Sequence, residues 1–175
     1  MNPRRIALTL PLILLICMSF KCDSGGTTAS ATARLQHSYE RALNDTAGVI
    51  NTMVGLKRKL AQQGKLTAAE DSRLTEQLLK INTAAKAVRS EGPLASSIPA
   101  LKSSIDELSP AIVTIQASDS KAELQRTLQS LEASAAALAN VSAMAASRCH
   151  DVGGGCIVCR GDPCTYCPFM APSCP

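Results

Sequence analysis

The stretch that decides the fold is LQHSYERALNDTAGVINTMVGLKRKLAQQGKLTAAE, residues 35–70. Its apolar residues recur at alternating steps of four and three, which places them along one side of a helix. This stripe consists of Leu35, Tyr39, Ala42, Thr46, Val49, Met53, Leu56 and Leu60. Gly64 stands where a left-handed helix end is expected, and Thr67 with Glu70 matches a capping box for a following helix. The stretch therefore predicts a long helix over residues 28–63, a tight turn and a second helix.

Three further apolar stripes with the same spacing follow in the chain. They comprise Leu74, Leu78, Ile81, Ala85 and Val88; Leu101, Ile105, Leu108, Ile112 and Ile115; and Leu124, Leu128, Leu131, Ala135, Leu138 and Val141. Gly92-Pro93 predicts the end of the second helix. The serines of LASSIP, residues 94–99, and of SDSKAE, residues 118–123, predict caps for the third and fourth helices.

Pro110 lies inside the third stripe. Proline lacks a backbone N–H and its ring crowds the preceding turn of a helix. We therefore expect a kink or a break of the helix near Ser109, and the stripe, which keeps its phase on both sides of Pro110, favours a kink.

Four amphipathic helices joined by short loops predict an all-α fold, an up-down-up-down four-helix bundle over residues 31–148. The alternating spacing is that of a coiled-coil-like seam. Aromatic residues make up only 2% of the chain, so the core buries little apolar area. We therefore expect a bundle of moderate stability unless a further element stabilises it. After Arg148, glycine, proline and cysteine predict a hinge in HDVGGGC, residues 150–156, within an irregular cysteine-rich tail, residues 149–175.

The beginning of the chain has the pattern of an export signal. MNPRR supplies a positive segment, and IALTLPLILLICMSF, residues 6–20, supplies an apolar segment that is short for a membrane span of about 20 residues. We assign residues 1–21 as a signal peptide and residues 22–30 as a flexible tether. Cys22 is then a candidate for lipidation. Cleavage by the ordinary signal peptidase after Ser19 is the alternative, favoured by Lys21 just before the cysteine.

The leader, the Gly/Ser tether and ALNDTAGVINTMVGLKRKLAQQGKLTAAEDSRL, residues 42–74, together resemble small uncharacterised bacterial envelope lipoproteins. Those proteins also carry a helix, a turn of the form GxLTxxE and a second helix. The resemblance covers the first half of the mature chain and does not include the cysteine-rich tail. It implies only the compartment, the bacterial cell envelope. With Cys22 lipidated we expect the chain to be anchored to the membrane on the periplasmic side, and with Cys22 unmodified we expect it to be secreted.

The tail contains six cysteines with palindromic spacing: Cys149, Cys156, Cys159, Cys164, Cys167 and Cys174. In an exported chain such a set is expected to form disulfides. Opposed residues of an antiparallel ribbon have a constant sum of residue numbers, and nested pairing of these cysteines gives a sum of 323 for every pair. This register favours the pairs Cys149–Cys174, Cys156–Cys167 and Cys159–Cys164, with a turn at Arg160-Gly161-Asp162-Pro163.

Three other interpretations of the tail stay open. Two CxxC pairs offer a tetrathiolate zinc site at Cys156, Cys159, Cys164 and Cys167, with zinc as the cofactor. CTYC, residues 164–167, resembles the thiol-exchange motif of glutaredoxins, although the βαβ context of those enzymes is missing. Arg160, Gly161 and Asp162 form the tripeptide that disintegrin-like proteins present to integrins, and here they also suit a plain turn.

The remaining charged residues indicate no catalytic or nucleic-acid site. The net charge of +4 is modest, and the basic run Lys57-Arg58-Lys59 is interpreted as a solvated helix face. His37 and His150 are the only histidines, and no acid-base constellation or nucleotide-binding motif is present. We expect no enzyme and no nucleic-acid partner. The sequence predicts a structural or protein-interaction role at the cell envelope with an unknown protein partner.

Overall fold

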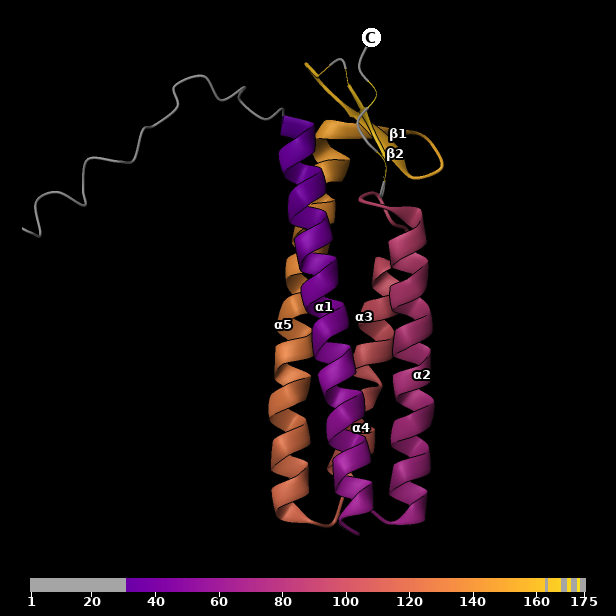
Figure 1. The fold of residues 1–175 in the computed structure, drawn as a ribbon, viewed down its shortest axis with the longest axis vertical. Coiled ribbons are helices and arrows are strands. Elements are labelled where there is room, and N and C mark those ends of the chain that lie inside the picture. The colour runs from indigo at the N-terminus through magenta and orange to yellow at the C-terminus, as the bar shows by residue number, and fades with distance from the viewer. Residues whose placement is uncertain (1–30, 163, 168–169, 171–172, 174–175) are drawn as a thin grey trace, which may run out of the picture.

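The computed structural model describes residues 31–162, 164–167, 170 and 173. It is a four-helix bundle with a small three-stranded sheet at one end (Figure 1). The predicted leader, tether and Cys22 lie outside the described residues. The helices are α1 (Ala31–Gln62), α2 (Ala68–Glu91), α3 (Ile98–Asp106), α4 (Leu108–Val113) and α5 (Ser118–Arg148), and the strands are β1 (Cys149–Gly153), β2 (Cys156–Cys159) and β3 (Thr165–Tyr166).

The predicted fold class is confirmed. Helices α1, α2, the α3–α4 pair and α5 pack antiparallel in a ring, in which α1 contacts both α2 and α5 (Figure 1). None of the helices in the described part of the chain has the length and apolar character needed to cross a membrane. Helix α1 is about 48 Å long, since it has 32 residues at about 1.5 Å per residue.

The predicted stripes form the core, with one difference in α1. Leu43 and Ile50 are buried although they lie outside the predicted stripe, whereas Val49 and Leu56 are only partly buried. The physical reason is that α1 packs against α5 on one side and α2 on the other. A helix with two neighbours needs an apolar face wider than the seam of a two-stranded coil.

The third helix is interrupted at Glu107, two residues before the kink or break expected near Ser109. α3 ends at Asp106 and α4 begins at Leu108, while Pro110 lies inside α4. Pro110 has no N–H to donate to the carbonyl of Asp106, so the loss appears in the turn that precedes the proline. Glu107 keeps helical angles, φ −67° and ψ −18°, and the stripe therefore stays in phase across the interruption.

The helix starts differ in how they are capped. The capping box of Thr67 and Glu70 is confirmed. The predicted serine caps are wrong, because the N-cap residues Ser97 and Ala117 make no side-chain capping bond. The backbone N–H of Ser97 instead donates to the carboxylate of Glu91, at 3.0 Å. A carboxylate from the preceding helix thus takes the place of a local cap.

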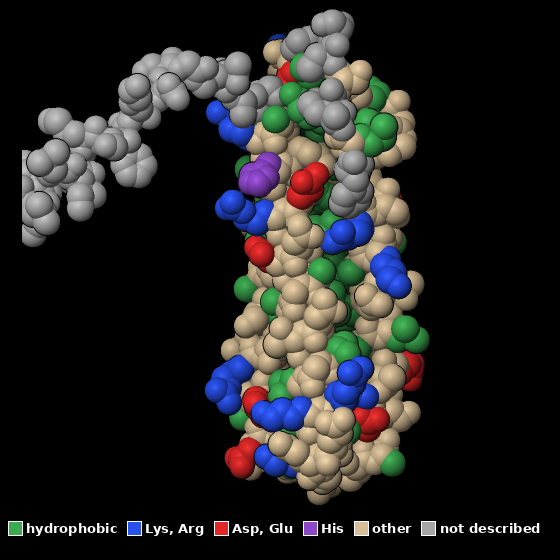
Figure 2. Space-filling model, viewed as in Figure 1, with side chains coloured by type: hydrophobic (Ala, Val, Ile, Leu, Met, Phe, Trp, Pro, Cys, Tyr) green, Lys and Arg blue, Asp and Glu red, His purple; other side chains and the backbone are tan. Residues whose placement is uncertain are grey.

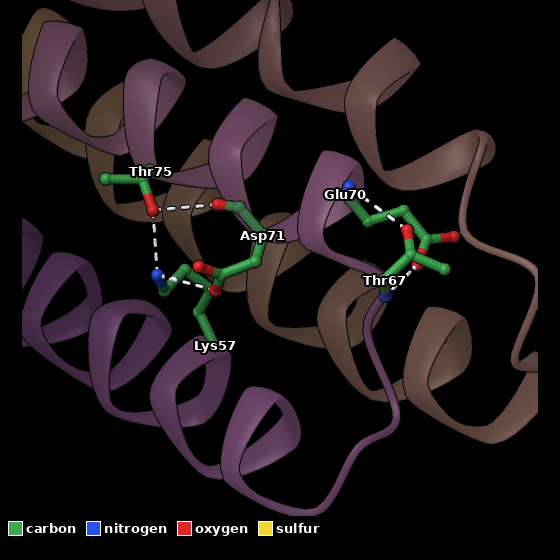
Figure 3. Close-up of polar contacts among 5 residues, drawn as sticks. All are labelled: Lys57, Thr67, Glu70, Asp71 and Thr75. Carbon is green, nitrogen blue, oxygen red and sulfur yellow. Dashed lines mark hydrogen bonds and ion pairs between the residues drawn. The ribbon is translucent and has the colours of Figure 1, made fainter.

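Glu70 connects the loop before α2 to the loop before α5, and Figure 3 shows its contacts with Thr67. Its Oε2 accepts hydrogen bonds from the Thr67 backbone N–H at 2.7 Å and from the Thr67 hydroxyl at 2.9 Å. Its Oε1 accepts from the backbone N–H of Gln116 at 3.0 Å, which ties the loop before α5 to the start of α2. These hydrogen bonds, that of the Thr67 backbone foremost, lower the pKa of Glu70.

Glu70→Gln is expected to weaken the acid sensitivity of the fold. Because the folded-state pKa is lowered, the carboxylate stabilises the protein above its ordinary pKa of 4.5, and this stabilisation is lost as the pH falls through the folded pKa. Urea denaturation between about pH 3 and 7 should show a smaller fall in the free energy of unfolding for Glu70→Gln. Thr67→Ala should cost about 1 kcal/mol at neutral pH.

The control for this prediction is Glu76→Gln, which removes an exposed carboxylate from the same helix. This variant should keep the acid-side fall of the natural protein. Glu91 also has a lowered pKa, since the hydrogen bonds from Ser97 and Ser96 outweigh the opposing effect of burial, so part of the fall should persist in Glu70→Gln. Identical pH curves for Glu70→Gln and the natural protein would contradict the role assigned to Glu70.

Candidate functional site

The cysteine tail forms an ordered sheet. β1 and β2 pair antiparallel, with Cys149 opposite Cys159 and His150 opposite Val158. The hinge predicted for HDVGGGC is therefore wrong, because this segment is a strand followed by a hairpin turn. Gly153, Gly154 and Gly155 have φ values of +115°, +63° and +76°, a backbone that glycine adopts without a steric penalty.

The predicted register of the tail is confirmed for β2 and β3. Ile157 pairs with Tyr166 and Val158 with Thr165, so that the residue numbers of each pair add up to 323. The disulfide Cys156–Cys167 predicted from the same register is also present.

Both of the other predicted disulfide pairs are wrong. Cys159 is bonded to Cys149, which excludes both Cys159–Cys164 and Cys149–Cys174. The reason is that β1 occupies the second edge of β2 and brings Cys149 opposite Cys159. Cys164 is also disulfide-bonded, and Cys174 lies outside the described residues.

The sheet packs onto the end of the bundle (Figure 1). Ile157 is fully buried and Tyr166 is 8% exposed, and both belong to a second small core with Cys149 and Cys159. Partly buried hydrophobic residues from the bundle end complete this core: Ala33, Leu35 and Leu94. The tail is therefore a cap on the bundle. In β2, half-buried and buried positions alternate, as they do in a strand with one face against a core.

The Arg-Gly-Asp tripeptide forms the connection between β2 and β3. The Asp162 N–H donates to the Cys159 carbonyl at 3.0 Å, and Gly161 has a φ of +81°, as the third residue of a type II turn requires. Asp162 is only 9% exposed, and its Oδ1 accepts from the Cys164 N–H at 3.0 Å. The geometry thus supports the turn interpretation of these residues, since the aspartate is engaged in holding the turn.

Asp162→Ala is expected to destabilise the sheet by about 1 kcal/mol, because the Cys164 N–H loses its acceptor. Asp162→Asn keeps an acceptor oxygen and should cost less. Amide hydrogen exchange of β2 and β3 measures both effects. If the tripeptide acted as an integrin ligand, Asp162→Asn would instead abolish attachment of integrin-bearing cells while leaving exchange unchanged.

The geometry of the tail gives no support to its zinc and redox interpretations. All four cysteines of the alternative zinc set are disulfide-bonded: Cys156, Cys159, Cys164 and Cys167. Zinc binds thiolates, which a disulfide does not provide. Across the described ranges, no three His, Cys, Asp or Glu side chains are grouped so as to hold a metal. In CTYC, Cys167 is bonded to Cys156 and therefore does not pair with Cys164.

A groove runs between α1 and α2. Two neighbouring hollows of about 430 Å³ and 250 Å³ share Ile50, Asn51 and Asn82 and form one furrow. Figure 2 shows hydrophobic side chains at the bottom of this seam and basic side chains along it. The walls are two stripes with helical spacing: Ala47, Asn51, Val54 and Arg58 from α1, and Thr75, Leu79, Asn82 and Lys86 from α2.

The groove has an apolar floor and bridged ends. Ile50 and Leu78 are each 4% exposed and form part of the floor. At one end, Arg89 donates from Nη2 to Oδ1 of Asn44 at 2.9 Å. At the other end, Lys57 binds the Asp71 carboxylate at 2.8 Å and donates to the Thr75 hydroxyl at 2.7 Å (Figure 3).

The groove carries cations that are not neutralised. Within the part of the chain that the structure describes, neither Arg58 nor Lys86 forms an ion pair, and no Asp or Glu lines the furrow. The interpretation of Lys57-Arg58-Lys59 as a solvated face is thus only partly right, because the Lys57 side chain is 16% exposed and bound to α2.

Sequence reasoning missed this groove. The sequence signal for the groove is a second stripe on α1 and on α2, next to the buried stripe of each helix. Residues near in sequence do not determine which helix lies opposite this second stripe. Comparison of the chain with protein-family models, with curated proteins and with solved structures gives no match. The functional argument therefore depends on the geometry of the described residues.

Proposed function

We propose that this chain is an exported, non-enzymatic binding protein, tethered to the membrane of a bacterial cell envelope through Cys22. The observation that carries the proposal is the α1/α2 groove, with its apolar floor and with Arg58 and Lys86, which form no ion pair within the described residues. A partner protein bound there would cover Leu79, which is 64% exposed. Binding proteins use such apolar patches edged by polar residues.

The disulfides support a location outside the cytoplasm. Cys149–Cys159 and Cys156–Cys167 hold together a sheet of only three short strands. Disulfides of this kind persist in oxidising compartments and are rare in the reducing cytosol. This agrees with the export signal expected at residues 1–21.

The position of the sheet suits a tether at the start of the chain. α1 begins beside β2 and β3, so Ala31 lies at the capped end of the bundle (Figure 1). Residues 22–30 span at most about 30 Å when fully extended. An anchor at Cys22 would therefore hold the capped end near the membrane and leave the far end of the groove facing away from it.

The titratable groups with shifted pKa values support a structural role over catalysis. Tyr39 is buried and donates its hydroxyl to the Val88 carbonyl at 2.7 Å, and burial raises its pKa. Glu70 and Glu91 bind backbone N–H groups of loops. Shifted groups at an active site would be expected to converge in a cleft, whereas these three hold chain segments together.

The mature protein isolated from its own cells tests the export and tether proposals. Intact mass should show an N-terminus at acylated Cys22 and tail cysteines that alkylate only after reduction. Cys22→Ser should move the protein from the membrane fraction to the soluble fraction. A mature chain that begins after Ser19 without lipid would overturn the tether, and tail thiols that alkylate without reduction would overturn the disulfide cap.

Photo-crosslinking in the same cells tests the binding role. A photoreactive amino acid is placed in turn at Asn82 in the groove, at Met144 on α5 and at Val113 on α4, all of which are exposed. Capture of a defined protein from any of these positions supports a binding role. Absence of captured protein at all three positions would overturn it.

A further inference from the structure

We infer that the α1/α2 groove binds an acidic amphipathic α-helix of a partner protein. This inference rests on the proposed binding role and adds the chemistry of the partner. Three features of the groove carry it: its length, the arrangement of its apolar floor and the sign of its charge.

The length of the groove fits a helix of moderate size. The bridges at Asn44 with Arg89 and at Lys57 with Asp71 mark its two ends. Along α1 these ends are separated by about 20 Å, from the rise of about 1.5 Å per residue. A partner helix of three to four turns would lie between the two bridges. It would then pack against both α1 and α2.

The floor matches one face of an amphipathic helix. Ile50 and Leu78 lie at the bottom of the furrow, with Val54 and the exposed Leu79 along its walls. A helix with apolar residues at steps of three and four places them along one stripe, which would fill this floor. The polar side chains Asn51 and Asn82 interrupt the apolar lining at the middle of the groove, where an acyl chain would leave their amides without partners.

The charge of the groove selects an acidic partner. Arg58 and Lys86 lie on opposite walls and toward opposite ends of the groove, and no carboxylate lines it within the described residues. Carboxylates flanking the apolar stripe of a helix would therefore meet a cation on either side. Complementary charges of this kind determine the choice of partner and speed association.

Four synthetic helical peptides with the same leucine stripe test the inference against the purified full-length mature protein. Their flanking positions carry glutamate, glutamine or lysine, and a fourth peptide has the glutamate flanks and a central proline. Fluorescence anisotropy should show the tightest binding for the glutamate peptide. Proline should abolish this binding because it breaks the helix, and high salt should weaken it because ions screen exposed charges.

The decisive variant is Arg58→Glu with Lys86→Glu, which should weaken binding of the glutamate peptide by about tenfold or more. The matched control is Lys102→Glu with Arg126→Glu, which changes the net charge equally on α3 and α5 and should bind normally. Circular dichroism of all variants verifies that the bundle is folded.

Several results would overturn the inference. They are no binding of the glutamate peptide at about 1 mM, equal binding of the glutamate and glutamine peptides, or equal loss in the control variant. Binding of anionic lipid vesicles that disappears in Arg58→Glu with Lys86→Glu, without peptide binding, would assign the groove to a membrane surface. Crosslinks from Met144 or Val113 but none from Asn82 would overturn the groove and leave the proposed binding role intact.

Discussion

Replacing Cys149 and Cys159 together by alanine is expected to destabilise the capping sheet by about 3 kcal/mol. The disulfide joins the first residue of β1, directly after α5, to the last residue of β2. Without it, ten residues of chain gain freedom in the unfolded state, and the sheet is held by the small core around Ile157 and Tyr166. The sheet should then unfold at a lower urea concentration than the bundle.

The two tyrosines of the chain separate the sheet from the bundle in this experiment. Tyr39 reports on the bundle and Tyr166 on the sheet, because each is buried in one of the two cores. Tyrosine fluorescence of a Tyr39→Phe background therefore follows the sheet alone, and far-ultraviolet circular dichroism follows the helices. A single transition for both probes at the midpoint of the natural protein would show that the disulfide contributes nothing to the cap.

Leu131→Ala is expected to lower the free energy of unfolding of the bundle by about 3 kcal/mol. Leu131 is fully buried in α5, so the smaller side chain leaves a cavity in the core of the bundle. A loss of this size is a large part of the total stability of a small domain. Urea denaturation followed by circular dichroism measures it.

Leu79→Ala provides the matched control for Leu131→Ala. The same atoms are removed from a side chain that is 64% exposed on the groove wall, and the stability should change by no more than about 0.5 kcal/mol. The same variant should weaken binding of the acidic helical peptide. A stability loss in Leu79→Ala equal to that of Leu131→Ala would mean that the groove wall is part of the core and not a binding surface.

The helices could be predicted because their signals are local. The stripe from Leu74 to Val88 is buried as expected, and the capping box of Thr67 and Glu70 forms as expected. Each signal depends on residues three or four positions apart, which a helix brings together whatever else the chain does. The interruption lies at Glu107, three residues before Pro110, because the missing hydrogen bond belongs to the carbonyl four residues before the proline.

The structure of the tail could be predicted only in part. The register of β2 against β3 follows from the spacing of the cysteines, and Cys156–Cys167 follows from the register. The partner of Cys159 does not follow from this spacing, because it depends on the pairing of β1 with β2 through three glycines, a composition that is also typical of a hinge. In addition, no residue within the tail indicates that Ile157 and Tyr166 pack on the bundle.

By itself, then, the sequence determined the four helices, their antiparallel order and one cysteine pair, because periodicity, caps and short loops act between near neighbours. The tertiary structure alone decided that the tail is a cap, that Cys149 meets Cys159 and that Asp162 holds a turn. It also decided that a stripe of α1 and a stripe of α2 face each other across an open groove. These features depend on which distant segments lie side by side, and that is settled by packing of the whole chain.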